Sequence, residues 1–329
     1  MKQEILKILK ESTGYVSGQK LCEVIGVSRS GIWKAINRLK EDGYEIDAVK
    51  NKGYYLRIVP DILTIDEIEE VLNSSWIGKN LECYNEIDST NIKARILADI
   101  GCPNGQLVVS DIQTQGKGRR GRTWLSEAGS MICMSMVLRS NVPIERVSAI
   151  TLVAALAVSE ALSDLTKEAN TQVKIKWPND IVIAGKKVCG ILTEMSCDME
   201  GVKYVVVGIG VNVNTKYFPK ELDGIATSIY NETGKNLKRS LVIAKIIERF
   251  EKYYAIFETD RSFEKLKLLY EEQMINKNRK VKVLGIREEY EGIAKGIDNN
   301  GELLVETETG EIRQVVSGEV SVRGIYGYI

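Results

Sequence analysis

The chain has 329 residues, of which 44% are hydrophobic and 27% are charged, and its 45 Lys and Arg residues balance its 45 Asp and Glu residues. This length and composition exclude a disordered protein and predict a soluble globular protein with more than one domain. The first residues, MKQEILKILKES, do not form a signal peptide. The longest strongly apolar stretch, near residues 149–158, is too short to cross a bilayer, so we expect a cytoplasmic protein without a membrane partner.

The residue types that most often bind metals are scarce. The six cysteines are scattered without a CxxC pair, which argues against a zinc site and a disulfide framework, and the chain contains no histidine. The usual general base and the commonest metal ligand are therefore missing. We expect no metal site formed by the protein itself. Any catalysis must then depend on positioning, Lys, Arg, carboxylates or a metal ion held mainly by substrate phosphates.

Residues 1–60 have the pattern of a helix-turn-helix. Apolar residues at helical spacing predict a helix over residues 2–12, and a second short helix begins near Ser17. A Gly-containing turn separates it from a third helix, which Ser28 caps and which ends at Gly43. The alternating segments of YEIDAVKNKGYYL then predict a β-hairpin, so the whole segment is predicted to be a winged helix-turn-helix.

The third helix of this segment has one polar and largely basic face, because no acidic residue occurs between Ser28 and Lys40. With 11 Lys and Arg against 7 Asp and Glu, residues 1–60 suit an anionic partner. A solvated face is the alternative for the helix alone, but helix, turn and wing together favour double-stranded DNA. The predicted DNA-binding residues are Ser28, Arg29, Ser30, Trp33, Lys34, Asn37 and Arg38 of the helix and Lys50 and Lys52 of the wing.

Beyond Pro60 the order of elements predicts two further domains, which makes the chain a multidomain α+β protein. Strands such as QLVVSDI and MICMSMVL alternate with helices, which fits an α/β domain with a mixed sheet at residues 61–275. This domain includes a helix predicted over residues 63–76 and two or three helices after residue 240. Residues 276–329 alternate short strands with Asn-Gly and Thr-Gly turns and predict a small SH3-like β-barrel.

A glycine-rich basic loop lies in the central domain. The sequence DIQTQGKGRRGRTW, residues 111–124, places Lys117, Arg119, Arg120 and Arg122 among three glycines. Glycines let successive backbone N–H groups turn inward, and the side chains add charge that pairs well with phosphate or carboxylate. The loop therefore predicts an anion-binding site. A solvated basic turn or a nucleic-acid patch is the alternative for the run in isolation.

Four further motifs accompany this loop: DSTN at residues 88–91, KWPND at 176–180, GIGVNVN at 208–214 and SGEVSVR at 317–323. Together with the loop and Gln113 they closely resemble the biotin protein ligases. The first domain makes the chain similar to the bifunctional subclass that is also a biotin operon repressor. The resemblance covers essentially the whole length. It departs from the family pattern at Lys117, where the family more often has an arginine. Lysine keeps the positive charge but cannot form the two parallel hydrogen bonds of a guanidinium group.

The resemblance implies an ATP-dependent ligase with biotinyl-5'-adenylate as its intermediate. Biotin and ATP are then the substrates, Mg²⁺ accompanies ATP, and Lys176 and Arg119 act at the reacting centre. The implied biotin-binding residues are Ser89, Thr90, Asn91, Gln113, Lys117, Gly118, Arg119, Lys176 and Gly190. The implied ATP- and adenylate-binding residues are Arg119, Arg120, Arg122, Trp124, Asn179 and Asn212.

These residues also have simpler structural interpretations. Lys176 fits an exposed strand lysine, and any one of the loop arginines fits a solvent-facing side chain. Trp124 fits a core tryptophan as well as a stacking partner for adenine. Ser89 and Thr90 fit a cap for the helix that follows Asp88, a role compatible with ligand binding.

The partners follow from the same resemblance. The acceptor is a lysine of a biotin carboxyl carrier protein, the adenylate is a corepressor, and its binding promotes a homodimer that presents two recognition helices to operator DNA. Three other functions stay open. These are a lipoate ligase, whose family motif includes a histidine that this chain lacks, a ligand-sensing repressor without ligase activity, and a ligase that does not bind DNA.

Overall fold

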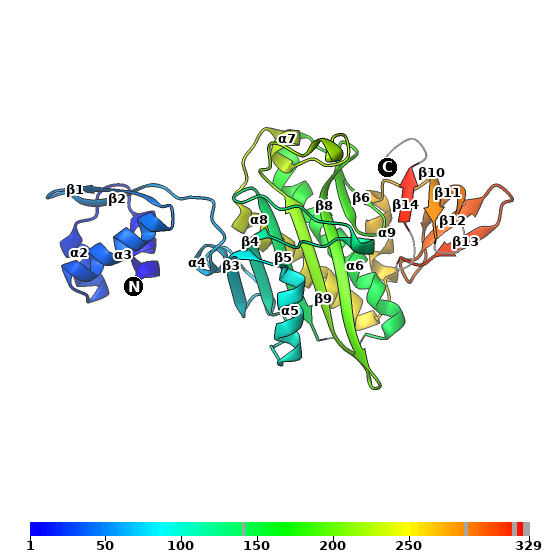
Figure 1. The fold of residues 1–329 in the computed structure, drawn as a ribbon, viewed down its shortest axis with the longest axis horizontal. Helices are drawn as coiled ribbons and strands as arrows, with labels where there is room; N and C mark the ends of the chain where they lie inside the picture. The colour runs from blue at the N-terminus through cyan, green and yellow to red at the C-terminus, as the bar shows by residue number, and fades with distance from the viewer. Residues whose placement is uncertain (140–141, 286–288, 318–320, 325–329) are drawn as a thin grey trace. The chain divides into compact units, whose positions relative to one another are not determined.

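The structure, a computed structural model, describes residues 1–139, 142–285, 289–317 and 321–324. It divides into two compact units, Met1–Ile62 and Leu63–Ile329, which have separate hydrophobic cores (Figure 1). The second unit contains both the central and the C-terminal part of the chain. The domain limits at residues 60 and 275 stay predictions.

The first unit is the predicted winged helix-turn-helix. Ser17 caps its second helix by accepting a hydrogen bond from the Lys20 N–H, and that helix ends at Gly26 in the left-handed conformation (φ 76°). Ser28 caps the third helix by accepting from the Gly31 N–H. The unit contains α1 (Lys2–Glu11), α2 (Gly18–Ile25), α3 (Arg29–Glu41), β1 (Glu45–Val49) and β2 (Gly53–Ile58).

A seven-stranded mixed sheet forms the centre of the second unit, as predicted. Its strand order is β3-β4-β5-β9-β8-β7-β6, and only the β3–β4 pair is parallel. Helix α5 (Thr90–Asp99) makes the crossover between these two strands. The strands are β3 (Leu81–Ile87), β4 (Leu107–Gln113), β5 (Met131–Leu138), β6 (Val173–Lys176), β7 (Asp180–Ile183), β8 (Lys186–Asp198) and β9 (Gly201–Asn212).

Helices cover the two faces of this sheet differently. Alternate strand residues point to opposite faces, so Val108 packs against α5 whereas Leu107 and Val109 pack into the main core. That core lies between the sheet and two long helices (Figure 1). The remaining helices of the second unit are α4 (Ile65–Glu69), α6 (Val147–Thr166), α7 (Ile229–Thr233), α8 (Arg239–Asp260) and α9 (Glu264–Gln273).

The helix predicted over residues 63–76 is much shorter, because α4 ends at Glu69. The carboxylate of Glu251 accepts hydrogen bonds from the backbone N–H groups of Ser75, Trp76 and Ile77 at 2.7–2.9 Å. These bonds replace the helical pattern at the end of the segment. Glu251 lies some 175 residues further along the chain, so the spacing of apolar residues near residue 63 does not predict this contact.

The apolar stretch at residues 149–158, which we expected to be too short to cross a membrane, is part of a longer apolar helix. Ile144–Ala169 passes as a membrane span by length and composition, since the helix continues on both sides of residues 149–158. However, 78% of the most apolar 18-residue stretch of this helix is buried inside the protein, where α6 packs against the sheet and α8. A core helix has this property, because its apolar surface is already covered by protein.

Within its described residues the C-terminal part consists of β-strands, as predicted. These strands form an antiparallel sheet in the order β13-β12-β11-β10-β14. Trp177 of the KWPND motif connects this sheet to the centre, because its buried indole N–H donates to the Gly301 carbonyl at 3.0 Å. The strands are β10 (Lys280–Leu284), β11 (Glu289–Ile297), β12 (Leu303–Thr307), β13 (Ile312–Val315) and β14 (Ser321–Gly324).

The separate cores predict independent unfolding of the two units. Leu21 is fully buried in the first core, so Leu21→Ala should cost that unit about 2–5 kcal/mol through reduced burial and a residual cavity. Calorimetry should show that only one of two thermal transitions moves. Ile150→Ala, in the other core, should move the second transition. A single transition that responds equally to both variants would contradict independence.

Candidate functional site

A pocket opens on the α5 face of the large sheet and contains about 450 Å³ of empty space, part of it open to solvent. Residues from strands β4, β5, β8 and β9, from the start of α5, and from the basic loop surround it. The lining residues are Ser89, Thr90, Asn91, Gln113, Lys117, Gly118, Arg119, Trp124, Cys133, Met134, Asn179, Lys187, Gly190, Ile191, Leu192, Gly208, Ile209 and Gly210.

Three glycines form the floor of this pocket. Gly190 of β8 lies directly opposite Gly210 of β9 in the antiparallel register, and Gly208 lies two residues along the same strand. A Cβ atom added at Gly210 would lie 2.5 Å from Trp124 Cε2, and one at Gly208 only 2.0 Å from Asn91 Oδ1. Because these positions carry no Cβ, Asn91 and Trp124 pack directly against the strand backbone, and the pocket between them reaches down to the sheet.

The start of α5 forms one wall. Ser89 is the N-cap residue, but among the described residues its side chain makes no capping hydrogen bond. The Gln113 side chain takes that role, since its Oε1 accepts from Thr90 N at 2.7 Å and Thr90 Oγ1 at 3.0 Å. Ser135 Oγ lies 2.7 Å from Thr90 Oγ1 and 2.6 Å from Asn91 Oδ1. The buried polar groups of this wall thus hold one another in place.

The basic loop forms the opposite wall. Arg119 Nη1 donates to Asn179 Oδ1 at 2.7 Å, and Nη2 donates to the Ser317 carbonyl. Burial lowers the pKa of Arg119 from its ordinary value, while Asp180 opposes the shift. Arg119 therefore joins the loop to the KWPND turn and to the C-terminal part. Residues 318–320 of the SGEVSVR motif lie outside the described residues.

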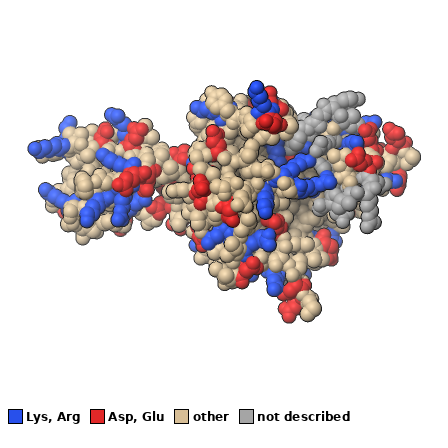
Figure 2. All heavy atoms as spheres, viewed as in Figure 1, with Lys and Arg blue, Asp and Glu red and all other residues tan. Residues whose placement is uncertain are grey.

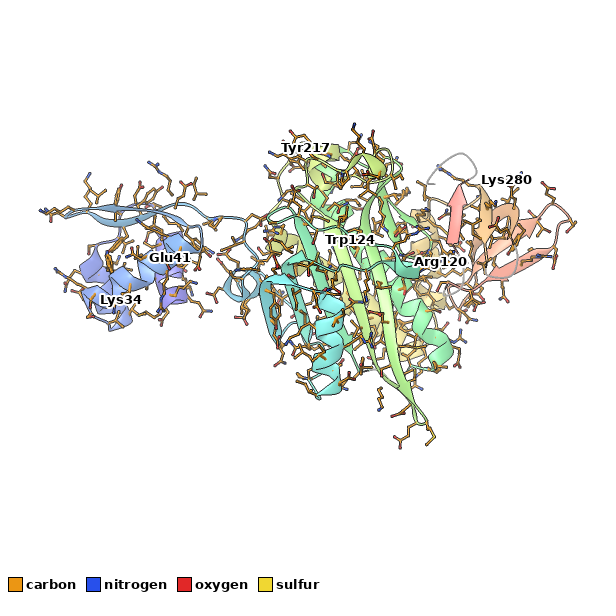
Figure 3. All side chains as sticks on the ribbon, in the orientation of Figure 1. Lys34, Glu41, Arg120, Trp124, Tyr217 and Lys280 are labelled. Carbon is orange, nitrogen blue, oxygen red and sulfur yellow. The ribbon has the colours of Figure 1, made fainter. Side chains whose placement is uncertain are left out.

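Lys and Arg side chains gather on the surface around this loop (Figure 2). Trp124 lies over the sheet, with Arg120 further along the loop (Figure 3). Arg120 and Arg122 are exposed, and neither is among the lining residues. The two arginines are therefore available to an anion at the mouth of the pocket rather than on its floor.

Lys187 brings a cation to the floor. Its Nζ lies 2.6 Å from Asp180 Oδ1 and 5.6 Å from the centre of the Trp124 ring. A Cβ atom at Gly190 would lie 2.9 Å from this Nζ, so the lysine side chain crosses over that glycine. Lys187 is 25% exposed, which leaves the ammonium group accessible from the pocket.

Lys176 is not among the lining residues. It lies opposite Asp180, which lies opposite Gly190, so two strand spacings, roughly 10 Å, separate it from the nearest floor glycine. It is also buried. Asn212 is likewise buried and outside the lining, and its amide donates to the Thr227 carbonyl at 2.9 Å.

Cys133 is the one thiol among the lining residues of the pocket. Burial raises its pKa to about 12, so the group stays a neutral thiol near neutral pH and is a poor nucleophile. Within the described residues, no group of three or more Cys, Asp or Glu side chains is arranged to hold a metal ion. The chemistry of the pocket therefore depends on its cations and its neutral hydrogen-bonding groups.

The first unit presents the predicted polar face of α3. Ile32, Ile36 and Leu39 are buried, whereas Trp33 is 58% exposed and Asn37 is half-buried. Lys34 lies on the outer side of the helix (Figure 3). The other predicted DNA-binding residues are exposed: Ser28, Arg29, Ser30, Lys34, Arg38, Lys50 and Lys52.

Comparisons with known proteins match nearly the whole chain. The bifunctional ligase/repressor BirA of Bacillus spizizenii is 38% identical over 98% of each chain, and that of Escherichia coli is 30% identical over 93% of this chain and 92% of its own. The chain belongs to the biotin protein ligase family. Its family matches are the Biotin/lipoate A/B protein ligase family at residues 87–212, an HTH domain at 2–55 and the Biotin protein ligase C terminal domain at 278–323.

A solved structure supports the fold of this biotin protein ligase family member. The biotin protein ligase from Aquifex aeolicus in complex with biotin and ATP has a TM-score of 0.65 and 35% identity, and covers 75% of this chain and 99% of its own. Among the floor residues, sequence reasoning missed Lys187. The sequence offers only the presence of a lysine three residues before Gly190. The adjacent Lys186 looks the same in the sequence, yet its side chain approaches Glu232 instead of the pocket.

The close approach of Asn91 to Gly208 predicts a steric effect. Gly208→Ala should destabilise this ligase by about 1–3 kcal/mol through overpacking, because Asn91 would have to leave its bonds to Ser135 and Glu194. Thermal unfolding measures the change. Adding Asn91→Ala should recover part of the stability, and Gly14→Ala, whose Cβ would meet nothing within 4 Å, serves as the neutral control. Equal melting temperatures for Gly208→Ala and the parent would contradict the described contact.

Proposed function

We propose that the glycine-floored pocket binds biotin and that the basic loop and Lys187 bring ATP phosphates to its carboxylate. The enzyme is a biotin--[biotin carboxyl-carrier protein] ligase: it forms biotinyl-5'-adenylate and pyrophosphate, then transfers biotin to a lysine amine of a carrier protein and releases AMP. One observation carries this proposal. A pocket with an uncharged, backbone-lined floor meets a cation at Lys187 and a glycine-rich basic loop at its edge.

The charges explain why this arrangement suits adenylate formation. A carboxylate must approach a phosphate, and both are anions, so a cation between them lowers their repulsion and stabilises the developing charge. The catalytic role of Lys176 stays a prediction, because its pairing with Asp180, which pairs with Gly190, puts its side chain on the same sheet face as the floor. Our proposal adds Lys187 as a second cation. Arg119 positions the loop through Asn179 and Ser317, and exposed Arg120 and Arg122 pair with phosphates.

The hydrogen-bonding groups of the other wall suit the polar ring of biotin. Ser89, Thr90, Asn91 and Gln113 line the pocket opposite the loop and are fixed by one another. Trp124 already lies over the floor, so we assign its indole to the boundary between biotin and adenine. Mg²⁺ would arrive with the ATP phosphates, because the described residues form no acidic cluster for it.

The second half-reaction requires little from the protein. An acyl adenylate is already activated, so no enzyme nucleophile is needed, and a buried neutral Cys133 is consistent with that. The acceptor amine must lose its proton, and near pH 7.5 only about one part in a thousand of a lysine with an unperturbed pKa is neutral. Neither step therefore requires a histidine side chain in our proposal.

The first unit makes the same chain a repressor of biotin genes. Its exposed α3 face and wing bind operator DNA, and biotinyl-5'-adenylate is the corepressor that promotes the homodimer. The exposed positions of Arg29, Lys34 and Lys50 support this proposal, as does the local excess of positive charge. A cytoplasmic location suits both activities.

The position of Lys187 generates the first functional test. Lys187→Ala should slow biotin-dependent pyrophosphate release on the order of a hundred- to a thousandfold, the usual cost of removing one donor at the point of charge build-up. Lys176→Ala tests the predicted role of the other lysine and should also slow pyrophosphate release. A loss of rate in Lys176→Ala alone would contradict a role for Lys187. Pyrophosphate release by the parent also excludes a repressor without ligase activity.

Operator binding is tested by a gel shift with DNA from upstream of the chain's own biotin genes. Arg29→Ala with Lys34→Ala should weaken binding and reduce the salt slope by about 0.9 for each DNA phosphate that the protein no longer neutralises. Lys7→Ala, an exposed lysine of α1, is the matched control. Biotin plus ATP should strengthen binding by the parent. No shift under any condition would favour a ligase that does not bind DNA.

A further inference from the structure

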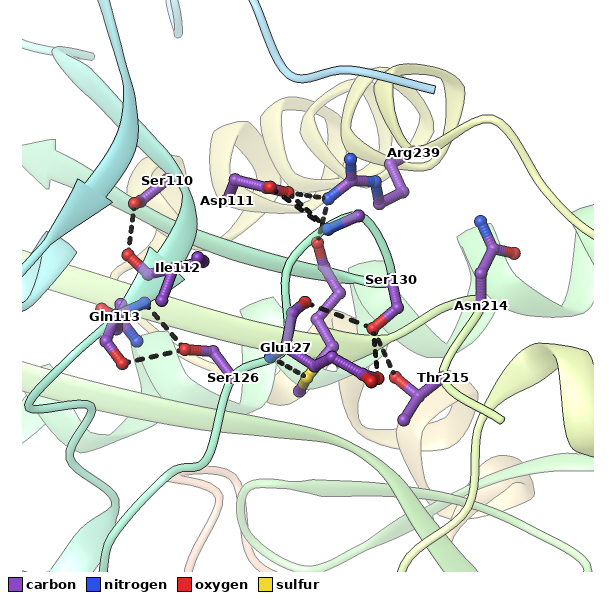
Figure 4. Close-up of polar contacts among 12 residues, drawn as sticks. Ser110, Asp111, Ile112, Gln113, Ser126, Glu127, Ser130, Asn214, Thr215 and Arg239 are labelled. Carbon is purple, nitrogen blue, oxygen red and sulfur yellow. Dashed lines mark hydrogen bonds and ion pairs between the residues drawn. The ribbon is translucent and has the colours of Figure 1, made fainter. Parts of the chain in front are cut away.

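The basic loop is held at its base by a charge pair whose arginine, Arg239, is buried and lies outside every motif named above. The loop leaves β4 after Gln113 and returns to β5 through residues 126–131, here called the loop anchor. Figure 4 shows the polar contacts around the anchor. Ser126 joins the two ends of the loop, because its Oγ accepts from the Gln113 N–H at 2.7 Å and donates to the Gln113 carbonyl at 2.9 Å.

Asp111 and Arg239 hold the anchor from the other side. Both carboxylate oxygens of Asp111 lie 3.1 Å from the Gly129 N–H. Arg239 Nη1 donates to Asp111 Oδ1 and to the Met131 carbonyl, the latter at 2.9 Å. The pair thus fixes the backbone at two points of the anchor, on either side of Ser130.

Arg239 is only 1% exposed, whereas Asp111 is 26% exposed. A guanidinium this deeply buried needs a charged partner, and removing one member of a buried pair costs far more than breaking a surface pair. Ser130 adds a further restraint, because its carbonyl accepts from the N–H groups of Val213 and Asn214. The end of the anchor is therefore held at Gly129, Ser130 and Met131, while most of residues 114–123 are exposed.

We propose that Arg239 and Asp111 are positioning residues that determine how long the basic loop stays closed over biotinyl-5'-adenylate. They touch no substrate and act by fixing one end of the loop. A loop with a fixed end loses less conformational freedom on closing, so closure is favoured. This inference rests on the proposed function.

Adenylate dissociation tests the proposal directly. Parent and variants are loaded with labelled biotinyl-5'-adenylate, chased with unlabelled adenylate, and sampled over time. Arg239→Met should release the adenylate about tenfold faster or more, which corresponds to about 1.4 kcal/mol. Arg239→Lys keeps the positive charge but lacks the guanidinium group, so its dissociation rate should lie between those of the parent and Arg239→Met. The first-order rate constant does not depend on the fraction of protein that is folded, so simple destabilisation leaves it unchanged.

The same helix offers a matched control. Arg249 of α8 pairs with Asp164 at 2.5 Å, away from the loop, so Arg249→Met should dissociate at the parental rate. If Arg239→Met does not fold, Arg239→Lys carries the test, with at least about a twofold faster release expected. Parental rates in folded Arg239 variants would overturn the inference. A parent that fails to bind adenylate would instead contradict the proposed function.

Trypsin provides a second readout, because the loop contains Lys117, Arg119, Arg120 and Arg122 as cleavage sites. Adenylate should protect the parent and Arg249→Met from cleavage within residues 117–122. In Arg239→Met the protection at the same adenylate occupancy should largely disappear. Equal protection in all three proteins would also overturn the inference.

Discussion

The ligand site depends on one constraint: three positions of β8 and β9 carry no side chain. Any Cβ at Gly208 or Gly210 would meet Asn91 or Trp124 at 2.0–2.5 Å, so α5 and the basic loop both approach the strand backbone itself. A sheet face is ordinarily filled by alternating side chains. Here the missing side chains let Asn91, Trp124 and Lys187 pack onto the strand backbone, and these three residues line the pocket.

The elements and motifs could be predicted because their signals are local. The capping serines Ser17 and Ser28, the alternating strands and the glycine-rich loop lie within a few residues of what they specify, and the structure has them where the patterns placed them. Tertiary contacts set the limits. Glu251 binds the backbone at residues 75–77, the end of the segment predicted as a helix, and strand register, not sequence spacing, places Lys187 beside the floor. In both cases the partner lies far from the local pattern in the sequence.

In the proposed function, a chain without histidine performs acyl activation with the charges of lysine and arginine. Lysine and arginine keep their charge near neutral pH, so the site depends on where its cations are held rather than on how they titrate. The holding groups come from distant parts of the sequence. Asp180 holds Lys187, and Asn179 with Ser317 holds Arg119, which makes the KWPND turn a support for both cations.

The start of α8 shows how such support is built. A helix N-terminus disfavours cations, yet Lys238 and Arg239 begin this helix, and among the described residues Lys238 makes no side-chain cap. Each cation has its own carboxylate: Lys238 pairs with fully buried Glu67 of α4 at 2.5 Å, and Arg239 pairs with Asp111 beside the loop anchor. Removing either carboxylate would leave a buried or half-buried cation at the positive end of the helix dipole. The position of the helix start therefore depends on both carboxylates, and through Arg239 the loop anchor depends on the helix.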